Sequence, residues 1–179
     1  MPRLFVAIDI PSEHAAALTG LQDEQLAARW TPASQLHCTL RYVGEVEDEV
    51  AGRLRDGLRQ IERPTLTLAT AGLDVFPSRR RPRVIVARLR DHPVLTRLRV
   101  DVETIVTDQG FDPDQKPFHP HVTIARPKGA TPRDVRRYLK THTDLPLQTF
   151  DVNAFHLYRS DLRASGALHT VVETYELGR

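Results

Sequence analysis

Cysteine is almost absent from this chain of 179 residues, and so are long apolar runs. The single cysteine, Cys38, excludes an intramolecular disulfide and a metal cluster held by several cysteines. The N-terminal stretch MPRLFVAIDI is interrupted by Asp9 too early for a signal peptide, and no apolar run approaches the length of a membrane span. We therefore expect a cytoplasmic protein without a membrane segment.

Lysine is also scarce, because three of the 25 basic residues are lysines and the other 22 are arginines. Arginine suits bidentate contacts to phosphate, although the codon bias of a GC-rich genome explains the same skew. The formal net charge of +2 permits an anionic partner without requiring one. With 40% apolar residues and no linker or low-complexity segment, residues 1–179 are predicted to form a single domain.

The periodicity of apolar residues predicts an α+β fold. Thr131, Pro132 and Asp134 form a typical helix start, and Ser12 is a candidate N-cap. Strands are expected over 3–9, 36–43, 65–75, 83–90, 121–125, 149–159 and 167–177, the last two as a hairpin around Ser165–Gly166, and helices over 12–29, 48–62, 93–108 and 132–140. Because the two halves have a similar order of elements, we predict two pseudo-equivalent lobes in one compact unit.

Two of the predicted strands carry the same pattern, His-x-Thr followed by an apolar residue: HCTL from His37 and HVTI from His121. Alternate residues of a strand share a face. Strict alternation therefore puts His37, Thr39 and Arg41 on one face, opposite Cys38, Leu40 and Tyr42 on the core side. In the second strand it exposes His121 and Thr123 and turns Val122 and Ile124 inward.

Chance explains one such pattern but hardly two. Eight histidines and 16 threonines predict about 0.7 His-x-Thr triplets, and about 0.3 when an apolar fourth residue is required. Two solvated strand histidines are the alternative interpretation. Histidine is the side chain whose ordinary pKa lets both protonation states exist near neutrality. Two histidines flanking one phosphate can therefore act as base and acid, with threonine hydroxyls and an arginine holding the phosphate oxygens. Nothing in this scheme requires a metal or another cofactor.

The stretches HCTLRYVGEV and FHPHVTIAR, together with the opening RLFVAIDIP, resemble the motifs of the two-histidine (2H) phosphoesterase superfamily. The resemblance is strongest to its bacterial and archaeal branch, the RNA 2′,3′-cyclic phosphodiesterases, also called 2′-5′ RNA ligases. It covers nearly the whole chain. It implies a bilobal fold with a pseudo-twofold axis and the two histidines facing each other across a central cleft.

The resemblance also implies roles for individual residues. His37 resembles the proton donor, His121 the proton acceptor, and Thr39 and Thr123 the hydroxyls that hold the phosphate. The implied activity is hydrolysis of an RNA 2′,3′-cyclic phosphate end to a 2′-phosphomonoester, with reversible 2′-5′ joining as the same chemistry run backwards. An arginine at the position of Arg126 is expected near the phosphate, although strict alternation turns it inward unless the strand bends.

The first motif departs from the family in having Tyr42-Val43 where Phe-Leu is usual, a change that keeps apolar bulk. By alternation, Arg41 is a second candidate for the phosphate contact, and Tyr42 is expected in the core. We predict that Phe118 and the loop arginines Arg79, Arg80 and Arg81 contact RNA. The alternative interpretation of the three arginines is a charged loop that contacts only solvent. The arginines and the lysine of helix 132–140 are more simply explained as a solvent-exposed face of the helix than as an RNA contact.

The sequence leaves three alternative functions open. The first is a phosphodiesterase for a small cyclic nucleotide or nucleotide-sugar cyclic phosphate, the second is a non-catalytic RNA-binding module, and the third is a metal hydrolase. The third uses His119 and His121 with Asp112, Asp114 and His37 as ligands, but the pair has no helical spacing and Pro120 stiffens it. We expect no metal, no obligate protein partner, and an RNA with a 2′,3′-cyclic phosphate end as the substrate.

Overall fold

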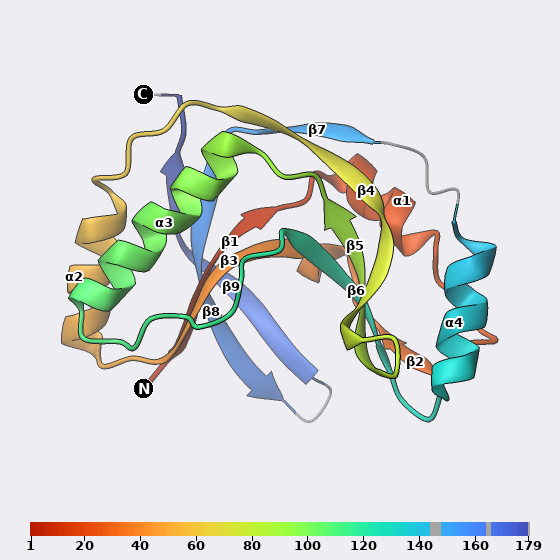
Figure 1. Cartoon of the computed structure of the whole chain (residues 1–179). Helices are drawn as coiled ribbons and strands as arrows, with labels where there is room; N and C mark the ends of the chain where they lie inside the picture. The colour runs from red at the N-terminus through yellow and green to blue at the C-terminus, as the bar shows by residue number, and fades with distance from the viewer. Residues whose placement is uncertain (144–147, 164–165, 179) are drawn as a thin grey trace.

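The computed structural model of the chain describes residues 1–143, 148–163 and 166–178. Within these residues it has the predicted α+β composition, with four α-helices, one short 3-10 turn and nine strands (Figure 1). The helices are α1 (Ser12–Thr19), α2 (Asp48–Leu58), α3 (Pro93–Asp108) and α4 (Pro132–Thr141). The strands are β1 (Arg3–Asp9), β2 (Ala28–Trp30), β3 (His37–Glu45), β4 (Leu66–Ser78), β5 (Arg81–Leu89), β6 (His121–Pro127), β7 (Thr149–Val152), β8 (Ala154–Arg163) and β9 (Gly166–Glu176).

The strand order confirms the two predicted lobes. Along the sheet the strands follow β7-β4-β5-β6-β3-β1-β8-β9, all pairs are antiparallel, and β2 is added to β6. The order divides into two groups of four that meet where β6 lies beside β3. At that junction the only Cα pair within the described residues joins Cys38 to Val122, so the sheet opens there into a bilobal shape. Each lobe thus contributes one His-x-Thr strand to the seam.

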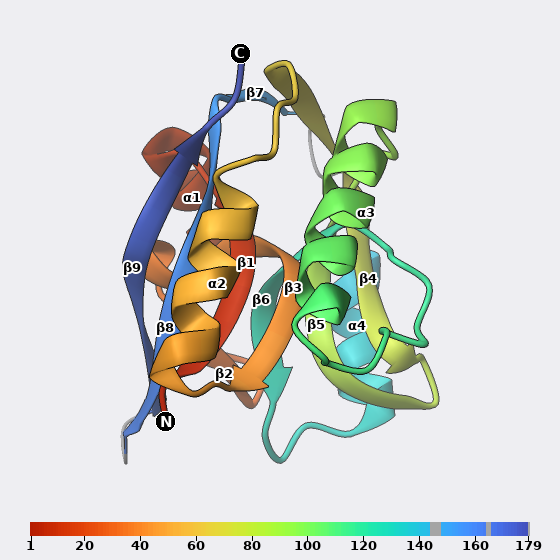
Figure 2. The same cartoon turned by 90° about the vertical axis from the view of Figure 1, so that its left-hand side faces the viewer.

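Helices α2 and α3 lie against each other and cover one side of the molecule (Figure 2). Their apolar stripes bury Leu54 and Leu58 of α2 against Leu95, Leu98 and Val102 of α3, each without exposed surface. Burying a leucine side chain contributes about 1.5–3 kcal/mol. This packing fixes the rear of the sheet, and with it the strands that carry the two motifs.

The start of α4 is the one that the sequence predicts. The Thr131 hydroxyl accepts a hydrogen bond from the Asp134 amide, the Asp134 carboxylate accepts from the Thr131 amide, and Pro132 is the first helical residue. At α1, by contrast, the expected N-cap Ser12 is already helical and Pro11 precedes it.

Two predicted elements differ most in extent from the structure, and the helix expected over 48–62 ends at Leu58. The first helix ends at Thr19 rather than near residue 29, because Gly20 follows it and residues 28–30 pair with β6 as β2. The strand expected over 149–159 is two strands, β7 and β8, which separate at Asn153 and pair in different lobes. The turn of the final hairpin was expected at Ser165–Gly166, and Ser165 lies outside the described residues. Among the described helices, none is long and apolar enough to cross a membrane.

Candidate active site

The antiparallel junction of β3 and β6 brings the two motifs together. Because Cys38 pairs with Val122, the register one residue further sets His37 opposite Thr123, and Thr39 opposite His121. The paired residues Cys38 and Val122 are fully buried on the core face. The two histidines and two threonines therefore share the other face, as strand alternation predicts.

Both imidazoles are held in the same way. The Nδ1 atom of His37 lies 2.8 Å from the Gln35 carbonyl oxygen, and that of His121 lies 2.7 Å from the His119 carbonyl oxygen. A carbonyl oxygen can only accept, so each Nδ1 donates its hydrogen and each Nε2 is left to exchange a proton with a ligand. Each ring also contacts a phenylalanine, Phe5 for His37 and Phe76 for His121, with ring centroids 5.0 Å apart in both cases.

A β-bulge follows each motif and changes which side chains reach this face. In β3, Val6 pairs with Arg41 but Ala7 pairs with Thr39, so Leu40 is an extra residue. In β6, Ile85 pairs with Ala125 but Val86 pairs with Thr123, so Ile124 is extra. A bulge reverses the alternation beyond it. Tyr42 and Arg126, five residues after their histidines, therefore rejoin the face that carries the imidazoles.

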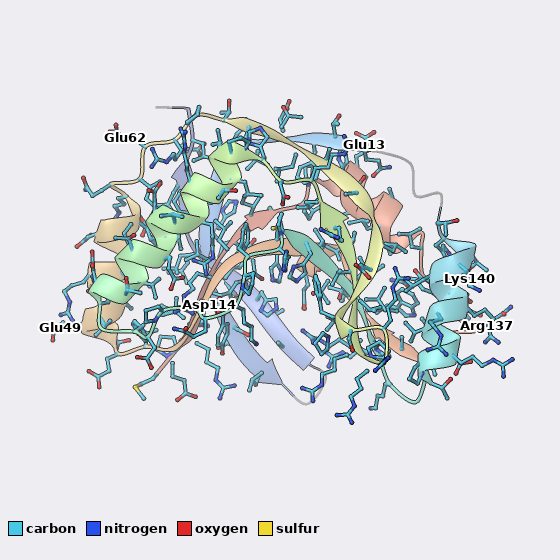
Figure 3. The ribbon with its side chains drawn as sticks, viewed as in Figure 1. Glu13, Glu49, Glu62, Asp114, Arg137 and Lys140 are labelled. Atoms are coloured by element: carbon cyan, nitrogen blue, oxygen red, sulfur yellow. The ribbon has the colours of Figure 1, made fainter. Side chains whose placement is uncertain are left out.

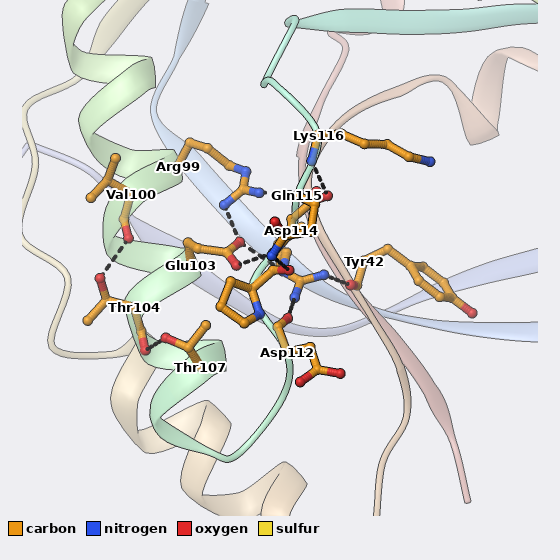
Figure 4. A network of polar contacts seen from close by, with 12 residues as sticks. Tyr42, Arg99, Val100, Glu103, Thr104, Thr107, Asp112, Asp114, Gln115 and Lys116 are labelled. Atoms are coloured by element: carbon orange, nitrogen blue, oxygen red, sulfur yellow. Dashed lines mark hydrogen bonds and ion pairs between the residues drawn. The ribbon is translucent and has the colours of Figure 1, made fainter. Parts of the chain in front are cut away.

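The bulge corrects two expectations from strict alternation. Tyr42 was expected in the core, but it is 52% exposed and lines the cleft. Arg41 was expected beside His37, but it turns to the opposite face. There its Nε lies 2.8 Å from a Glu103 carboxylate oxygen, and its guanidinium donates to the carbonyls of Tyr42 and Asp112 at 2.7 and 2.6 Å. In Figure 4 the Tyr42 ring points away from this network.

Arg41 is held in that position by an ion pair and two hydrogen bonds. Its side chain is 12% exposed, and Glu103 is shared with Arg99, a buried arginine that also reaches Asp114 at 3.3 Å. The guanidinium thus anchors the loop after α3 to β3 and does not line the cleft. Of the two arginines considered for the phosphate, Arg126 is the one that the structure brings to the motif face.

A cleft of about 330 Å³ opens over the motif face. It is lined by His37, Thr39, Thr123 and Arg126, which the sequence singled out, and by residues from four further segments. Sequence reasoning missed these others: Phe5 of β1, Arg29 and Trp30 of β2, Thr31, Pro32 and Gln35 after it, Ser160 of β8, and Ala167 and His169 of β9. Nothing local in the sequence indicates them, because tertiary pairing brings their strands to the cleft.

Burial lowers the pKa of both motif histidines. For His37 the pKa falls to about 4, mainly through burial and further through the neighbouring His169, while the Gln35 carbonyl and Asp9 act in the opposite direction. For His121 burial again lowers the pKa, opposed by the His119 carbonyl. Both rings are therefore mainly neutral at pH 7. A bound phosphate anion favours the protonated form of either ring.

The residues expected to contact RNA lie elsewhere on the surface. Arg79, Arg80 and Arg81 are exposed at the turn between β4 and β5, and the Arg79 guanidinium lies 3.7 Å from Asp74. Phe118 is half-buried against the core, with the Arg99 guanidinium 5.7 Å from its ring centroid. The cations of α4 face outward, as Figure 3 shows for Arg137 and Lys140.

The residues of the metal hypothesis do not converge. The exposed His119 ring stacks on Phe76 at 6.3 Å, and His119 uses its carbonyl to hold His121. Asp114 is tied to Arg99. Within the described part of the chain, no three His, Cys, Asp or Glu side chains are grouped so as to hold a metal ion.

Comparisons with known proteins define the class of this fold and site. Over residues 10–164 the chain matches the family model of the 2′-5′ RNA ligase superfamily. A solved structure titled E. coli LigT complexed with 3′-AMP superimposes with a TM-score of 0.81 at 26% identity, covering 100% of both chains. A solved structure of the Thermus thermophilus protein TT0787 gives a TM-score of 0.82 at 27% identity, covering 97% of both chains.

Curated relatives agree with the structural neighbours. The chain is 36% identical over 136 residues to a protein of Aeropyrum pernix named RNA 2′,3′-cyclic phosphodiesterase, covering 74% of this chain and 77% of the relative. It is 34% identical over 193 residues to the protein of that name from Thermus thermophilus, covering 98% and 90%. The chain therefore belongs to the 2′-5′ RNA ligase superfamily, as its motifs suggest.

Proposed function

We propose that this protein hydrolyses 2′,3′-cyclic phosphate ends of RNA to 2′-phosphomonoesters, using His37 and His121 as general acid and base without a metal. The observation that carries the proposal is the pairing of Cys38 with Val122, because it makes the two His-x-Thr strands neighbours at the seam beside the cleft. The curated relatives named RNA 2′,3′-cyclic phosphodiesterase support the substrate class.

In the proposed reaction, water attacks phosphorus opposite the 3′ oxygen, and the Nε2 atom of His121 takes the proton that the water loses. The bond from phosphorus to the 3′ oxygen breaks, and the Nε2–H of His37 gives its proton to that oxygen. The product has a 2′-phosphate and a free 3′-hydroxyl, and one water is consumed. Each proton transfer of this kind typically contributes about 10²–10⁴-fold to the rate.

The threonines and the arginine hold the phosphate in this scheme. The hydroxyls of Thr39 and Thr123 donate to the two non-bridging oxygens from opposite sides. Arg126 offsets the negative charge that grows on those oxygens in the transition state. Support for Arg126 comes from its position in the cleft lining, where Arg41 is absent.

The assignment of acid and base is the one that the family resemblance implies. His37 gives its proton to the departing ribose oxygen, and His121 takes the proton of the attacking water. The cleft lining includes His37, which supports placing the nucleoside beside that ring.

The wider surface and setting complete the proposal. Arg79, Arg80 and Arg81 contact RNA phosphates upstream of the cyclic end, and Phe118 meets the RNA only at its exposed edge. The protein works in the cytoplasm as a single domain without an obligate protein partner. Joining RNA ends through a 2′-5′ linkage is the reverse reaction, with a 5′-hydroxyl in place of water.

The size of the cleft favours a second candidate function. At about 330 Å³ it lies at the lower end of ligand pockets and suits roughly one nucleotide. A phosphodiesterase acting on a free nucleoside 2′,3′-cyclic phosphate uses the same residues and the same steps. The two candidates differ only in whether the RNA beyond the last nucleotide adds to recognition.

The test is incubation of the purified protein with a short RNA ending in a 2′,3′-cyclic phosphate, in buffer containing EDTA. We expect a 2′-phosphate product, full activity with the chelator, and losses of about 10²–10⁴-fold when His37 or His121 is replaced by alanine. A nucleoside 2′,3′-cyclic phosphate of the same terminal base is the matched small substrate. A 3′-phosphate product, or RNA binding without turnover, contradicts the proposal.

A further inference from the structure

A carboxylate lies beside one of the two motif histidines. Asp9 is the last residue of β1 and the Cα partner of His37 across the β1–β3 ladder, so the two side chains share the cleft face. Its charge raises the pKa of His37 against the stronger effect of burial. The reaction described above assigns no role to Asp9.

Asp9 is held by its own contacts. One carboxylate oxygen accepts a very short hydrogen bond from the Tyr158 hydroxyl, and the other lies 3.6 Å from Nε2 of His156. Burial and the Asp9 carboxylate raise the pKa of Tyr158, which keeps its hydroxyl protonated as the donor. The Tyr158 ring stacks on Phe5 at 5.0 Å, and Phe5 contacts the His37 ring. The carboxylate and the imidazole are therefore fixed on one rigid set of rings.

The other lobe has the opposite charge at the equivalent position. In the strand order β5 lies beside β6 as β1 lies beside β3, and the Cα partner of His121 on β5 is Arg88. Its guanidinium lies 4.0 Å from Asp74, which offsets its charge. Of the two cross-strand partners, only Asp9 shifts the pKa of its histidine. The two imidazoles thus differ in the charge of the cross-strand partner beside them.

We propose that Asp9 is a positioning residue for His37, because the β1–β3 pairing sets its carboxylate beside that ring to counter the effect of burial, whereas Arg88 takes the equivalent position beside His121. This inference rests on the proposed function, in which His37 is the proton donor. An acid must carry its proton when the substrate is bound, and an adjacent carboxylate stabilises that form. The base needs no such partner.

Other groups around His37 act in defined directions. His169 of β9 meets its ring edge-on at 5.3 Å, and His121 lies on the neighbouring strand β6; both lower the pKa of His37. Tyr158 of β8 lies 6.1 Å away and stays neutral. Among the described side chains that shift the pKa of His37, Asp9 is the one that raises it.

The test follows histidine side-chain signals by NMR through a pH titration of the full chain, with the His37 signal assigned by its loss in His37→Asn. In Asp9→Asn, which keeps an oxygen for Tyr158, we expect the pKa of His37 to fall and that of His121 to stay. Asp151→Asn, an exposed carboxylate on β7, is the matched control and moves neither. An unchanged or raised pKa of His37 in Asp9→Asn overturns the proposal.

A second variant distinguishes an effect of the Asp9 charge from an effect of packing, and it also provides the test if Asp9→Asn fails to fold. Tyr158→Phe removes the hydroxyl that shares the carboxylate's charge but leaves the carboxylate. The pKa of His37 then stays or rises, opposite to its change in Asp9→Asn. A fall in Tyr158→Phe means that the cluster acts only through packing, and overturns the inference.

Activity gives a further readout. A fall of one unit in the pKa of His37 lowers its protonated fraction about tenfold at neutral pH. We therefore expect kcat/KM of Asp9→Asn on cyclic-phosphate RNA to fall by up to about tenfold, with KM nearly unchanged. If the wild type does not turn over that RNA, the proposed function fails, while the NMR titration still decides whether Asp9 controls His37.

Discussion

Replacing Arg126 and Arg41 by alanine, one at a time, separates a side chain in the cleft from one packed behind the sheet. Strict strand alternation assigns Arg41 to the phosphate, whereas the two bulges assign Arg126. The two variants should therefore differ in kind. One loses activity at constant stability, and the other loses stability at nearly constant activity per folded molecule.

The magnitudes follow from the contacts. A hydrogen bond from arginine to a charged oxygen is worth about 1.5–3 kcal/mol, so Arg126→Ala should lower kcat/KM by about 10- to 150-fold. Arg41→Ala leaves the carbonyls of Tyr42 and Asp112 without their guanidinium donor, while Glu103 keeps Arg99. Each intramolecular hydrogen bond of this kind contributes about 0.5–1.5 kcal/mol net, so the loss of both lowers the Tm by about 2–12 °C in a chain of this size.

The assay is kcat/KM on RNA with a 2′,3′-cyclic phosphate end, measured beside thermal unfolding of the same preparations. Arg133→Ala on the exposed face of α4 is a control that removes an arginine outside the cleft lining. If Arg41→Ala loses more than about tenfold in kcat/KM at an unchanged Tm, and Arg126→Ala loses little, the reversal of alternation at the bulges does not govern the site.

Three further outcomes are expected. Gly57→Ala should lower the free energy of unfolding by about 1–3 kcal/mol in urea, because its new Cβ would lie 2.8 Å from Cγ2 of Ile105. Because the pKa of His37 is lower in the folded chain than in the unfolded chain, stability should fall as the pH drops from about 6.5 to about 4. His37→Asn should flatten that dependence in urea titrations at each pH. Thr131→Ala should cost about 1 kcal/mol in thermal unfolding through loss of the α4 cap.

Local sequence signals predicted what local geometry controls. The alternation of His37, Cys38 and Thr39 holds in β3, and that of His121, Val122 and Thr123 holds in β6, because neither strand is bulged between its histidine and its threonine. Beyond Thr39 and Thr123 the prediction fails. A bulge depends on how a strand pairs with its neighbour, and the residues Leu40 and Ile124 that form it are ordinary strand residues.

Contributions from distant strands were not predictable for a related reason. Asp9, Tyr158 and His169 come from β1, β8 and β9, and they approach His37 only because those strands pair in that order. Local sequence patterns do not encode strand order, so the side chains that surround His37 could not be predicted from the sequence. The end of α1 and the division of β7 from β8 were missed because pairing in the sheet decided both.

The repeat of the motif on two strands provides more side chains around one point than a single strand can. One strand places its alternate side chains on a face in a single row, and a single row cannot surround a phosphate. Two strands in antiparallel register double the number and set each histidine opposite the other strand's threonine. A bulge after each motif then returns one more side chain, Tyr42 on one strand and Arg126 on the other. The frame is symmetric, but the cross-strand neighbours of the two imidazoles are not, since Asp9 lies opposite His37 and Arg88 lies opposite His121.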